Sequence, residues 1–366
     1  MTFTDEYDMI IEKLTKEWYA MNTLIPQPKW ETSKYSRKQI ERAGKMLSNK
    51  AISDAERQEA LIVLDNWRSS HAYPLHVITN NLRRNNPNAI VVQRLKRLES
   101  IVDKLQRFPD MNLYRMQDLG GCRIIVDNLE DVYKTVDKYK NSNIRHILKR
   151  ENDYIQNPKI SGYRCYHMVY QYHSDKTDIY NKNMLIEIQV RTKLQHIWAT
   201  AVEMMGIYTQ TSLKSSIGDE DILRFFTLVS SVFALKENTP VCPNTSNNRS
   251  ELINEIKEID KKHMIISTIS ALSKATEMTN TSQLKIKNGY YILRLDFNTM
   301  QLYVTGYQKN RFQEAVYVYD SLEQRHEPNT DTVLISGDSF DTIRTAYPNY
   351  FADIGKFVDM MIKILK

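Results

Sequence analysis

Two sets of charged side chains in this sequence have the chemistry that phosphoryl transfer requires. Arg94, Lys96 and Lys104 are cations that lie close together in the chain, and such charges can hold a triphosphate in line for attack. Asp118 stands before a Leu-Gly-Gly sequence, and Glu187 lies within an apolar run. Two such carboxylates can share a divalent metal ion, and one of them can act as a base for a hydroxyl group. The sequence therefore predicts a site for a metal-bound triphosphate.

An aromatic ring for a second substrate follows in the chain. The segment 159–163 is Lys-Ile-Ser-Gly-Tyr, a turn with an exposed ring, and Tyr163 could stack on a purine with about 1–3 kcal/mol. His167 could contact phosphate or simply pack. Each feature also has an ordinary structural explanation: a solvated helix face for the cations, a cap for Asp118, a solvent-facing strand position for Glu187 and a packed turn for Tyr163. The prediction depends on the whole set occurring in this order.

The elements around these residues predict a mixed α/β unit. Apolar spacing indicates helices over 55–83 and 91–107, and the second would carry Arg94 and Lys104 about three turns apart on roughly one side. Short apolar runs indicate buried strands, with helices between them. The strands are expected at 122–126, 168–172 and 184–190, and the helices at 129–139 and 192–205. This order predicts an α/β (α+β) fold with a mixed sheet and flanking helices.

The rest of the chain predicts a helical start and a small second module. Helices are expected at 5–21 and 222–235, and the segment 237–250, rich in Pro, Asn and Thr, predicts a linker that an isoleucine-containing helix follows. Alternating apolar and polar residues then indicate strands. The alternation covers 291–297 and 302–305, and further strands are expected at 315–319 and 333–335, before a last helix at 354–365. The C-terminal part is therefore predicted to be a small antiparallel β module with a terminal helix.

Composition excludes several classes of protein. The 366 residues carry a net charge of +6, which permits a polyanionic partner without requiring one. Cys122, Cys165 and Cys242 are widely spaced and odd in number, so neither a zinc pattern nor a disulfide framework fits, and a cytoplasmic location is expected. The acidic N-terminus lacks the layout of a signal peptide. The apolar stretch 222–235 is too short to span a bilayer and contains Arg224, so a membrane role is not expected.

Taken together, the blocks of charged and aromatic residues resemble the synthetase domain of the RelA/SpoT homologue superfamily over about residues 67–206. The most specific parts are the Gly-Tyr pair at 162–163 and the sequence Glu-Ile-Gln-Val-Arg-Thr at 187–192. The resemblance implies transfer of pyrophosphate from ATP to a ribose 3′-hydroxyl, with Mg²⁺ as cofactor. It also implies a role for each residue. Arg94 and Arg123 would sandwich the adenine of ATP, and Lys96 and Lys104 would hold its phosphates. Asp118 and Glu187 would position magnesium, and Glu187 would also activate the hydroxyl. Tyr163 would stack on the acceptor base, with Lys159, His167 and Gln189 around the acceptor.

Two further segments resemble a narrower branch, the fused toxin–antitoxin synthetases of the CapRel type. They are Ser-His-Ala-Tyr-Pro-Leu at 70–75 and Ala-Tyr-Pro-Asn-Tyr-Phe at 346–351. In that branch a C-terminal module, called a pseudo-zinc finger, restrains the toxin, and a Tyr-x-x-Tyr segment blocks the ATP site. Tyr347 and Tyr350 match this segment and, three residues apart, could enter one pocket from one side of a helical turn. The alternative is that they anchor the last helix.

The resemblance implies four parts of the chain and a function in defence. The parts are an N-terminal helical region at 1–66, a pyrophosphokinase toxin domain at 67–236, a linker with a connecting helix at 237–280, and an antitoxin and sensor module at 281–366. The expected acceptor is the 3′-terminal adenosine of tRNA, so that translation stops, and the expected activator is a phage capsid or other structural protein. The expected tRNA contacts are Lys29, Arg37, Lys38, Arg145, Lys149 and Arg150. Two alternatives stay open: an alarmone synthetase acting on guanine or adenine nucleotides, and a non-catalytic RNA-binding protein.

Overall fold

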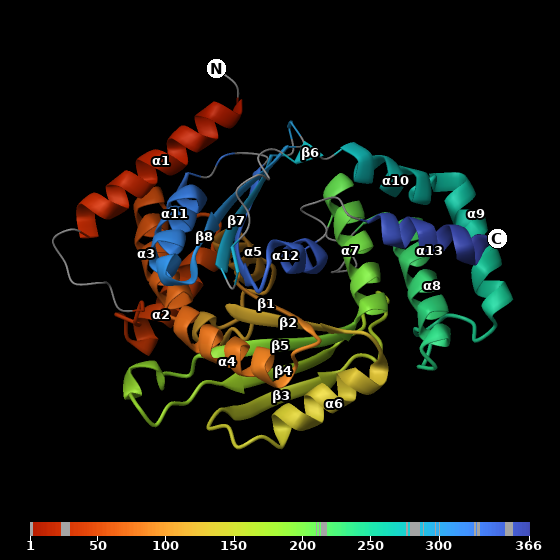
Figure 1. Cartoon of the computed structure of the whole chain (residues 1–366), viewed down its shortest axis with the longest axis horizontal. Helices are drawn as coiled ribbons and strands as arrows, with labels where there is room; N and C mark the ends of the chain where they lie inside the picture. The colour runs from red at the N-terminus through yellow and green to blue at the C-terminus, as the bar shows by residue number, and fades with distance from the viewer. Residues whose placement is uncertain are drawn as a thin grey trace.

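One mixed sheet runs through the molecule, and helices pack on its faces and at its ends (Figure 1). The computed structural model describes residues 3–22, 30–209, 211, 213, 218–275, 277–278, 286–287, 289–296, 298–299, 301–325, 327, 330–347 and 354–366. Over these residues the sheet has nine strands in the order β3-β4-β5-β2-β1-β9-β7-β8-β6. The strands are β1 Ile90–Leu95, β2 Gly120–Val126, β3 Ile147–Asp153, β4 Tyr166–Gln171, β5 Leu185–Thr192, β6 Glu277–Met278, β7 Gly289–Asp296, β8 Gln301–Tyr307 and β9 Thr330–Gly337. The predicted α/β class with a mixed sheet is confirmed.

The helices divide into groups by their position around the sheet. In Figure 1, α1, α3 and α11 lie at one end of the molecule, and α8, α9, α10 and α13 gather at the other. The helices are α1 Phe3–Asn22, α2 Arg37–Ser48, α3 Asp54–Ser69, α4 Ala72–Asn85, α5 Leu98–Arg107, α6 Leu129–Lys140, α7 Lys193–Tyr208, α8 Glu220–Lys236, α9 Arg249–His263, α10 Ile265–Ala275, α11 Phe312–Gln324, α12 Phe340–Ala346 and α13 Gly355–Leu365. Two of them begin with capping boxes, Ser36 with Gln39 on α2 and Ser53 with Glu56 on α3, which satisfy helix N–H groups that would otherwise lack partners.

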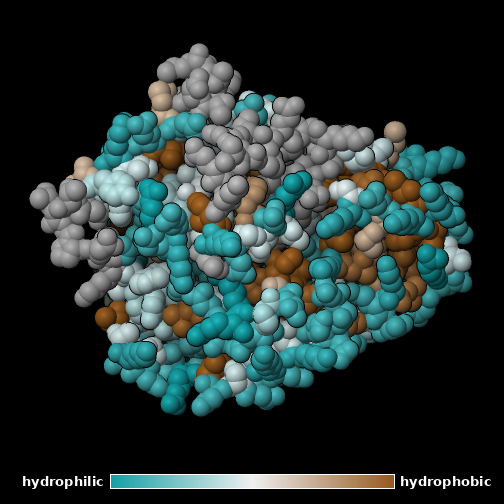
Figure 2. Space-filling view, in the orientation of Figure 1, coloured by the Kyte–Doolittle hydropathy of each residue, from teal (hydrophilic) through white to brown (hydrophobic). Residues whose placement is uncertain are grey.

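Separate apolar clusters hold these groups of helices in place. One cluster joins α2 to α6 with the strands β1, β2, β4 and β5, and another joins α7 to α10 with α13. The second cluster reaches the surface, where Figure 2 shows apolar side chains over the end formed by α8, α9 and α13. Met264 and Ile362 are among the exposed large apolar residues there. No helix among the described residues is long and apolar enough to cross a membrane.

The predicted helix over 91–107 is wrong for its first part. Residues Ile90–Leu95 form strand β1, and the helix α5 begins only at Leu98. Val91 and Val92 are both fully buried, because β1 pairs with β2 on one side and with β9 on the other. Branched side chains on adjacent positions suit a strand that is covered on both faces. Arg94 and Lys104 therefore lie on a strand and a helix, and not on one helix face.

The predicted strand at 315–319 is also wrong. This segment lies within helix α11, Phe312–Gln324. Its buried residues Ala315, Val318, Tyr319 and Leu322 follow a spacing of three and four, which is the spacing of one helix face. The sequence analysis also missed the edge strand β3 and the short helix α12. The strands at β7, β8 and β9 and the terminal helix α13 agree with the predictions.

The C-terminal strands continue the central sheet. Strand β9 pairs antiparallel with β1 through Gln93 and Ser336 and through Arg94 and Ile335. This is a short contact beside the long registers that β9 forms with β7 and β1 forms with β2. Addition of a strand to a sheet edge is a common way for one module to dock on another. The C-terminal module, defined here as β7, β8, β9, α11 and α12, thus covers the edge of the strand that carries Arg94.

Candidate active site

One pocket gathers most of the residues predicted to act in catalysis and nucleotide binding. It is lined by Arg94, Lys96, Asp118, Gly121, Cys122, Arg123, Tyr163, Glu187, Gln189, Arg191 and Tyr347. Strand register explains how residues so far apart in sequence meet: Arg94 of β1 lies opposite Gly121 of β2, which lies opposite Glu187 of β5. Alternate residues of a strand point to the same face, so Arg123 and Gln189, two positions further, extend the same surface.

Asp118 is the meeting point of two predicted phosphate-binding cations. Its carboxylate accepts hydrogen bonds from Lys104 Nζ at 2.9 Å on each oxygen and pairs with Lys96 Nζ at 3.2 Å. Burial alone would raise the pKa of Asp118, but the two ammonium groups hold that pKa below its usual range. Burial also lowers the pKa of Lys96. Lys96, directly after β1, and Lys104, in the last turn of α5, thus bind one carboxylate.

Glu187, which lines the same pocket, is held by two donors. His167 Nδ1 lies 3.0 Å from Glu187 Oε1, and Gln189 Nε2 donates to Oε2 at 2.8 Å. Burial would raise the pKa of Glu187, but these bonds and the charge of His167 lower it. Burial likewise opposes the charged form of His167, yet Cys165 and Glu187 raise its pKa to about 9. Glu187 is therefore an ionised carboxylate at neutral pH, and His167 is positively charged beside it.

The turn that carries Tyr163 continues this network. The Tyr163 hydroxyl lies 2.8 Å from His167 Nε2, which donates to it when the ring is charged. Gly162 has φ +87°, and a Cβ there would lie 2.9 Å from the Trp198 ring, so this position needs glycine. Lys159 Nζ lies 5.4 Å from the centre of the Tyr163 ring. The predicted exposed ring is instead half-buried, because its hydroxyl is drawn towards His167.

The C-terminal module enters the pocket through Tyr347. Helix α12 ends at Ala346, and the Tyr347 side chain that follows is buried. Its ring lies 5.5 Å from the guanidinium carbon of Arg123, whose Nη1 donates to the Ala346 carbonyl at 3.0 Å. Burial raises the pKa of Tyr347, while Arg123 and Arg94 oppose this rise. The ring thus lines the pocket together with Arg94 and Arg123, the two arginines predicted to hold adenine. The predicted partner Tyr350 lies outside the described residues.

His196 is a contact residue that the sequence analysis missed. Its Nε2 donates to the Thr345 carbonyl at 2.7 Å, and its Nδ1 accepts from Arg191 Nη2. The histidine therefore links Arg191, inside the pocket, to the end of α12. Nothing in the sequence marks this pairing, since His196 and Thr345 are 149 positions apart and the bond uses a main-chain carbonyl.

Those of the predicted tRNA contacts that the structure describes lie on α2, on the segment before β3 and on β3. Arg37 and Lys38 are exposed on α2, and Arg37 pairs with Glu41 at 2.8 Å. Arg145 lies ahead of β3 and pairs with Asp175 at 2.8 Å. Strand β3 itself carries two further exposed cations from the predicted set. These two are Lys149 and Arg150. Lys29 lies outside the described residues. Arg150 is close enough to Lys159 to lower the pKa of that lysine, together with burial.

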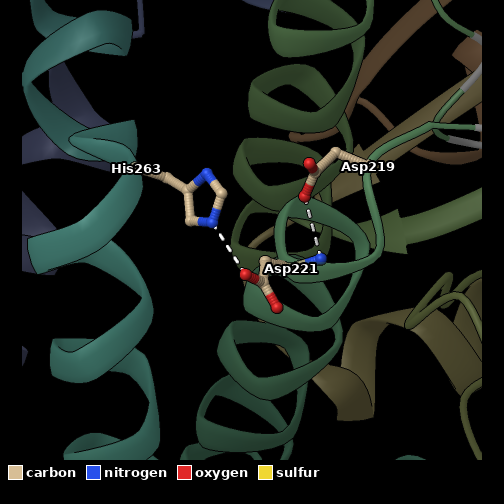
Figure 3. A group of neighbouring side chains, drawn as sticks. All are labelled: Asp219, Asp221 and His263. Atoms are coloured by element: carbon tan, nitrogen blue, oxygen red, sulfur yellow. Dashed lines mark hydrogen bonds and ion pairs between the residues drawn. The ribbon is translucent and has the colours of Figure 1, made fainter.

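A second acidic group lies away from this pocket. Asp219, Asp221 and His263 come within reach of one another where α8 begins and α9 ends (Figure 3). Asp219 caps α8 by accepting from the backbone N–H groups of Asp221 and Ile222. Asp221 pairs with His263 at 2.7 Å and with Lys262 at 2.6 Å. Helix capping and ion pairing account for both carboxylates, so this group joins two helices.

Comparison with known proteins identifies the family. Residues 93–212 match the model described as a region found in RelA / SpoT proteins. GTP pyrophosphokinase YjbM of Bacillus subtilis (strain 168) is 34% identical over 116 residues, which are 31% of this chain and 54% of YjbM, so the matched region spans about half of that relative. GTP pyrophosphokinase YwaC of the same organism is 30% identical over 147 residues, 38% of this chain and 69% of YwaC. The solved small alarmone synthetase 1 from Bacillus subtilis gives a TM-score of 0.40 and 23% identity, covering 56% of this chain and 100% of that chain. The chain belongs to the RelA/SpoT family and contains a GTP pyrophosphokinase-like synthetase domain.

Proposed function

We propose that this protein transfers pyrophosphate from ATP to the 3′-hydroxyl of an acceptor nucleotide. The observation that carries the proposal is the pocket in which an ionised, firmly held Glu187 faces the cations around Asp118. Phosphoryl transfer depends mainly on positioning and on offsetting negative charge, and this pocket provides both. Membership of the RelA/SpoT family supports the same reaction.

The proposed roles follow the positions of the side chains. Arg94 and Arg123 would hold the adenine, and Lys96 and Lys104 would exchange Asp118 for the phosphates when ATP enters. Carboxylate oxygens are the ligands that Mg²⁺ prefers, and Asp118 and Glu187 line one pocket, so this pair fits the ion. A bound Mg²⁺ would offset charge on the phosphates.

Glu187 is the proposed base. Its carboxylate would accept the proton of the acceptor hydroxyl as that oxygen bonds to the β-phosphorus of ATP, while the bond from this phosphorus to the α–β bridging oxygen breaks and AMP leaves. His167 and Gln189 fix the carboxylate for this step. Tyr163 and Lys159 would contact the acceptor base and its phosphates from the neighbouring turn.

A guanine nucleotide is the better supported acceptor, because the similar proteins are GTP pyrophosphokinases. The 3′ end of tRNA is the second candidate. The exposed cations Lys149 and Arg150 on β3 favour it, since Arg150 lies near Lys159 at the proposed acceptor side. A polyanion longer than a nucleotide could extend across this edge of the sheet.

ATP labelled in its β-phosphate separates these acceptors. The purified protein would be incubated with GDP, GTP, ADP or tRNA in turn, with Glu187→Gln as the inactive variant and Glu130→Gln, an exposed site on α6, as its matched control. Label in guanine nucleotides alone supports an alarmone synthetase, and label in tRNA alone supports the tRNA function. Absence of transfer to every acceptor from both the wild type and a folded Tyr347→Ala protein, which removes the ring from beside Arg123, would instead favour a non-catalytic RNA-binding protein.

We further propose that the C-terminal module restrains this activity through Tyr347, with Tyr350 as a second blocking residue. The position of the Tyr347 ring beside Arg123 supports this, because adenine and the ring would compete for one place. A tethered blocker acts at high effective concentration, so a modest contact suffices. An activator, for which we propose a phage structural protein, must bind the released state better than the closed one.

Tyr347→Ala tests the restraint. We expect this variant to transfer pyrophosphate at least about tenfold faster than wild type without any activator, which corresponds to loss of about 1.4 kcal/mol of closure. Tyr347→Ala combined with Glu187→Gln should be inactive. Unchanged activity of a folded Tyr347→Ala protein would remove the blocking role and leave Tyr347 as a packing residue.

A further inference from the structure

Helix α11 makes a charged contact with the N-terminal helices that is separate from the contact of α12. Arg68, at the end of α3, is fully buried. Its guanidinium donates to Asp320 at 2.5 Å, to Glu323 at 3.3 Å and to the Tyr319 hydroxyl at 3.2 Å. Asp65, one turn earlier on α3, accepts a further bond at 2.8 Å. One guanidinium group thus connects residues that are 251 to 255 positions apart.

One of these carboxylates also completes a helix of the candidate ATP site. Helix α5 begins at Leu98, and the side chain of its N-cap residue Arg97 makes no capping bond. Glu323 Oε2 accepts from the Leu98 backbone N–H at 3.1 Å, so the cap comes from the C-terminal module. A carboxylate in this place satisfies a free N–H and matches the positive end of the helix dipole. The last turn of α5 carries Lys104, which binds Asp118.

The same module also contacts the strand that carries Arg94 and that ends just before Lys96. Strand β9 pairs with β1 at Gln93 and Arg94. Asp331 of β9 forms an ion pair with Arg97, in the connection from β1 to α5. The C-terminal module therefore fixes the segment 94–104 at its strand, at its connection and at the start of its helix.

We propose that the C-terminal module positions the ATP-binding segment 94–104 through Glu323 and Asp331, in addition to blocking the pocket through Tyr347. Glu323 and Asp331 are positioning residues, because they act on ATP through α5 and Arg97. This inference rests on the proposed function of the pocket. It means that the module has to stay docked by α11 when the enzyme works, and that only α12 and Tyr347 leave.

The chemistry of the two contacts is consistent with α11 staying docked while α12 leaves. The α11 contact combines the buried bonds of Arg68 with packing of Phe312 against Trp30, whose ring centres lie 4.5 Å apart. Buried charges with several hydrogen-bond partners are costly to separate. The α12 contact includes donors from His196 and Arg123 to two main-chain carbonyls. The α12 contact also buries Ile343, Ala346 and Tyr347 in one apolar cluster with the sheet. An opening that breaks this contact alone leaves the buried charges around Arg68 paired.

The test measures ATP affinity in the full chain carrying Tyr347→Ala, so that the blocking ring does not mask the effect. Glu323→Ala, Glu323→Gln and Asp331→Asn would be compared in this background, with Glu130→Gln as a surface control. Calorimetric titration with a non-hydrolysable ATP analogue gives affinity without requiring turnover. The KM values for ATP and for the acceptor are measured separately, with thermal unfolding to establish that each variant is folded.

We expect Glu323→Ala to weaken analogue binding by roughly fivefold to tenfold, the size of a lost helix cap, and to leave the acceptor KM unchanged. Glu323→Gln should recover most of the affinity, since its amide oxygen can still accept from Leu98. Unchanged affinity in both Glu323→Ala and Asp331→Asn would overturn the proposal, and so would equal losses in Glu323→Ala and Glu323→Gln. If Glu323→Ala does not fold, Asp331→Asn decides by the same criterion.

The failure of this inference can be told apart from failure of the proposed function. Weaker analogue binding in Glu323→Ala, without transfer to any acceptor in the parent, would support the positioning role and reject pyrophosphate transfer. Transfer of pyrophosphate by the parent, together with unchanged ATP affinity in Glu323→Ala and Asp331→Asn, would support pyrophosphate transfer and reject the positioning role. Absence of analogue binding in the Tyr347→Ala parent would overturn both.

Discussion

Helices α11 and α12 belong to the same C-terminal module, yet they contact the rest of the chain through different chemistry. Helix α11 presents two carboxylates and a tyrosine hydroxyl to the buried Arg68. Helix α12 offers main-chain carbonyls to His196 and Arg123 and places one ring in the pocket. Its Ile343 and Ala346 also pack in an apolar cluster with the sheet. A contact of buried charges is selective and hard to break, whereas carbonyl acceptors can return to water at small cost. The difference indicates how one module can be both anchored and releasable.

Among the changes that test this comparison, replacement of Arg68 should cause the largest loss of stability. Arg68→Ala would leave Asp65, Asp320 and Glu323 close together without their shared cation. We expect the free energy of unfolding to fall by about 3–5 kcal/mol, as for other buried pairs that lose one partner. Urea unfolding checks this, with the exposed Arg84→Ala as control. A loss below about 1 kcal/mol would show that the α11 contact is no stronger than a surface ion pair.

The protonation of Asp320 provides the next test. Burial is the largest influence and, with the nearby carboxylates of Asp65 and Glu323, raises the pKa of Asp320 to about 8 against the opposing charge of Arg68. The folded state therefore holds a proton that the unfolded state has lost between about pH 4 and pH 8. Stability from this group falls as pH rises through that range, by at most about 1.4 kcal/mol per pH unit.

Asp320→Asn should remove this dependence, because asparagine stays neutral at every pH. Urea unfolding of both proteins from pH 6 to pH 9 should give a shallower decline for Asp320→Asn than for wild type. The exposed Asp110→Asn serves as the control and should follow wild type. Parallel curves for wild type and Asp320→Asn would contradict the raised pKa and would indicate that Asp320 is ionised beside Arg68.

The smallest expected effect concerns His196 and α12. His196→Ala removes one donor to the Thr345 carbonyl, and a hydrogen bond of this type contributes about 1 kcal/mol. Hydrogen exchange of the α12 amides should therefore speed up by roughly fivefold, while exchange in α11 stays unchanged. His173→Ala, at a half-exposed histidine, is the control. Equal acceleration in α11 and α12 would mean that the module opens as one body.

The sequence was most informative where function restricts residue type. The pocket residues Asp118, Tyr163, Glu187 and Gln189 were all predicted as one site, and the structure brings them together. Their local motifs place a carboxylate before a buried strand and a polar residue at every second position of another, which fixes the face on which they lie. The roles given to these side chains remain proposals.

The errors arose where tertiary contacts override local patterns. The segment Ile90–Leu95 has only 6 residues, which is too short to show a clear helical pattern. Pairing with β2 on one side and with β9 on the other makes it a strand. The segment 315–319 is a short run of Val and Tyr, which favour strands, yet its longer context has a helical spacing. The Arg68 contacts were beyond prediction, because they join residues more than two hundred positions apart. The same holds for His196, whose acceptor is a main-chain carbonyl.

The bonds that His196 and Arg123 make to α12 have a consequence for how this chain can change over time. Every amino acid carries the same main-chain carbonyl, so these two bonds do not depend on which side chains α12 displays. An outward position of α12 such as Asp341 is exposed, so a substitution there leaves both carbonyl bonds in place as long as the helix forms. Mutational drift on that face would leave closure of the pocket intact.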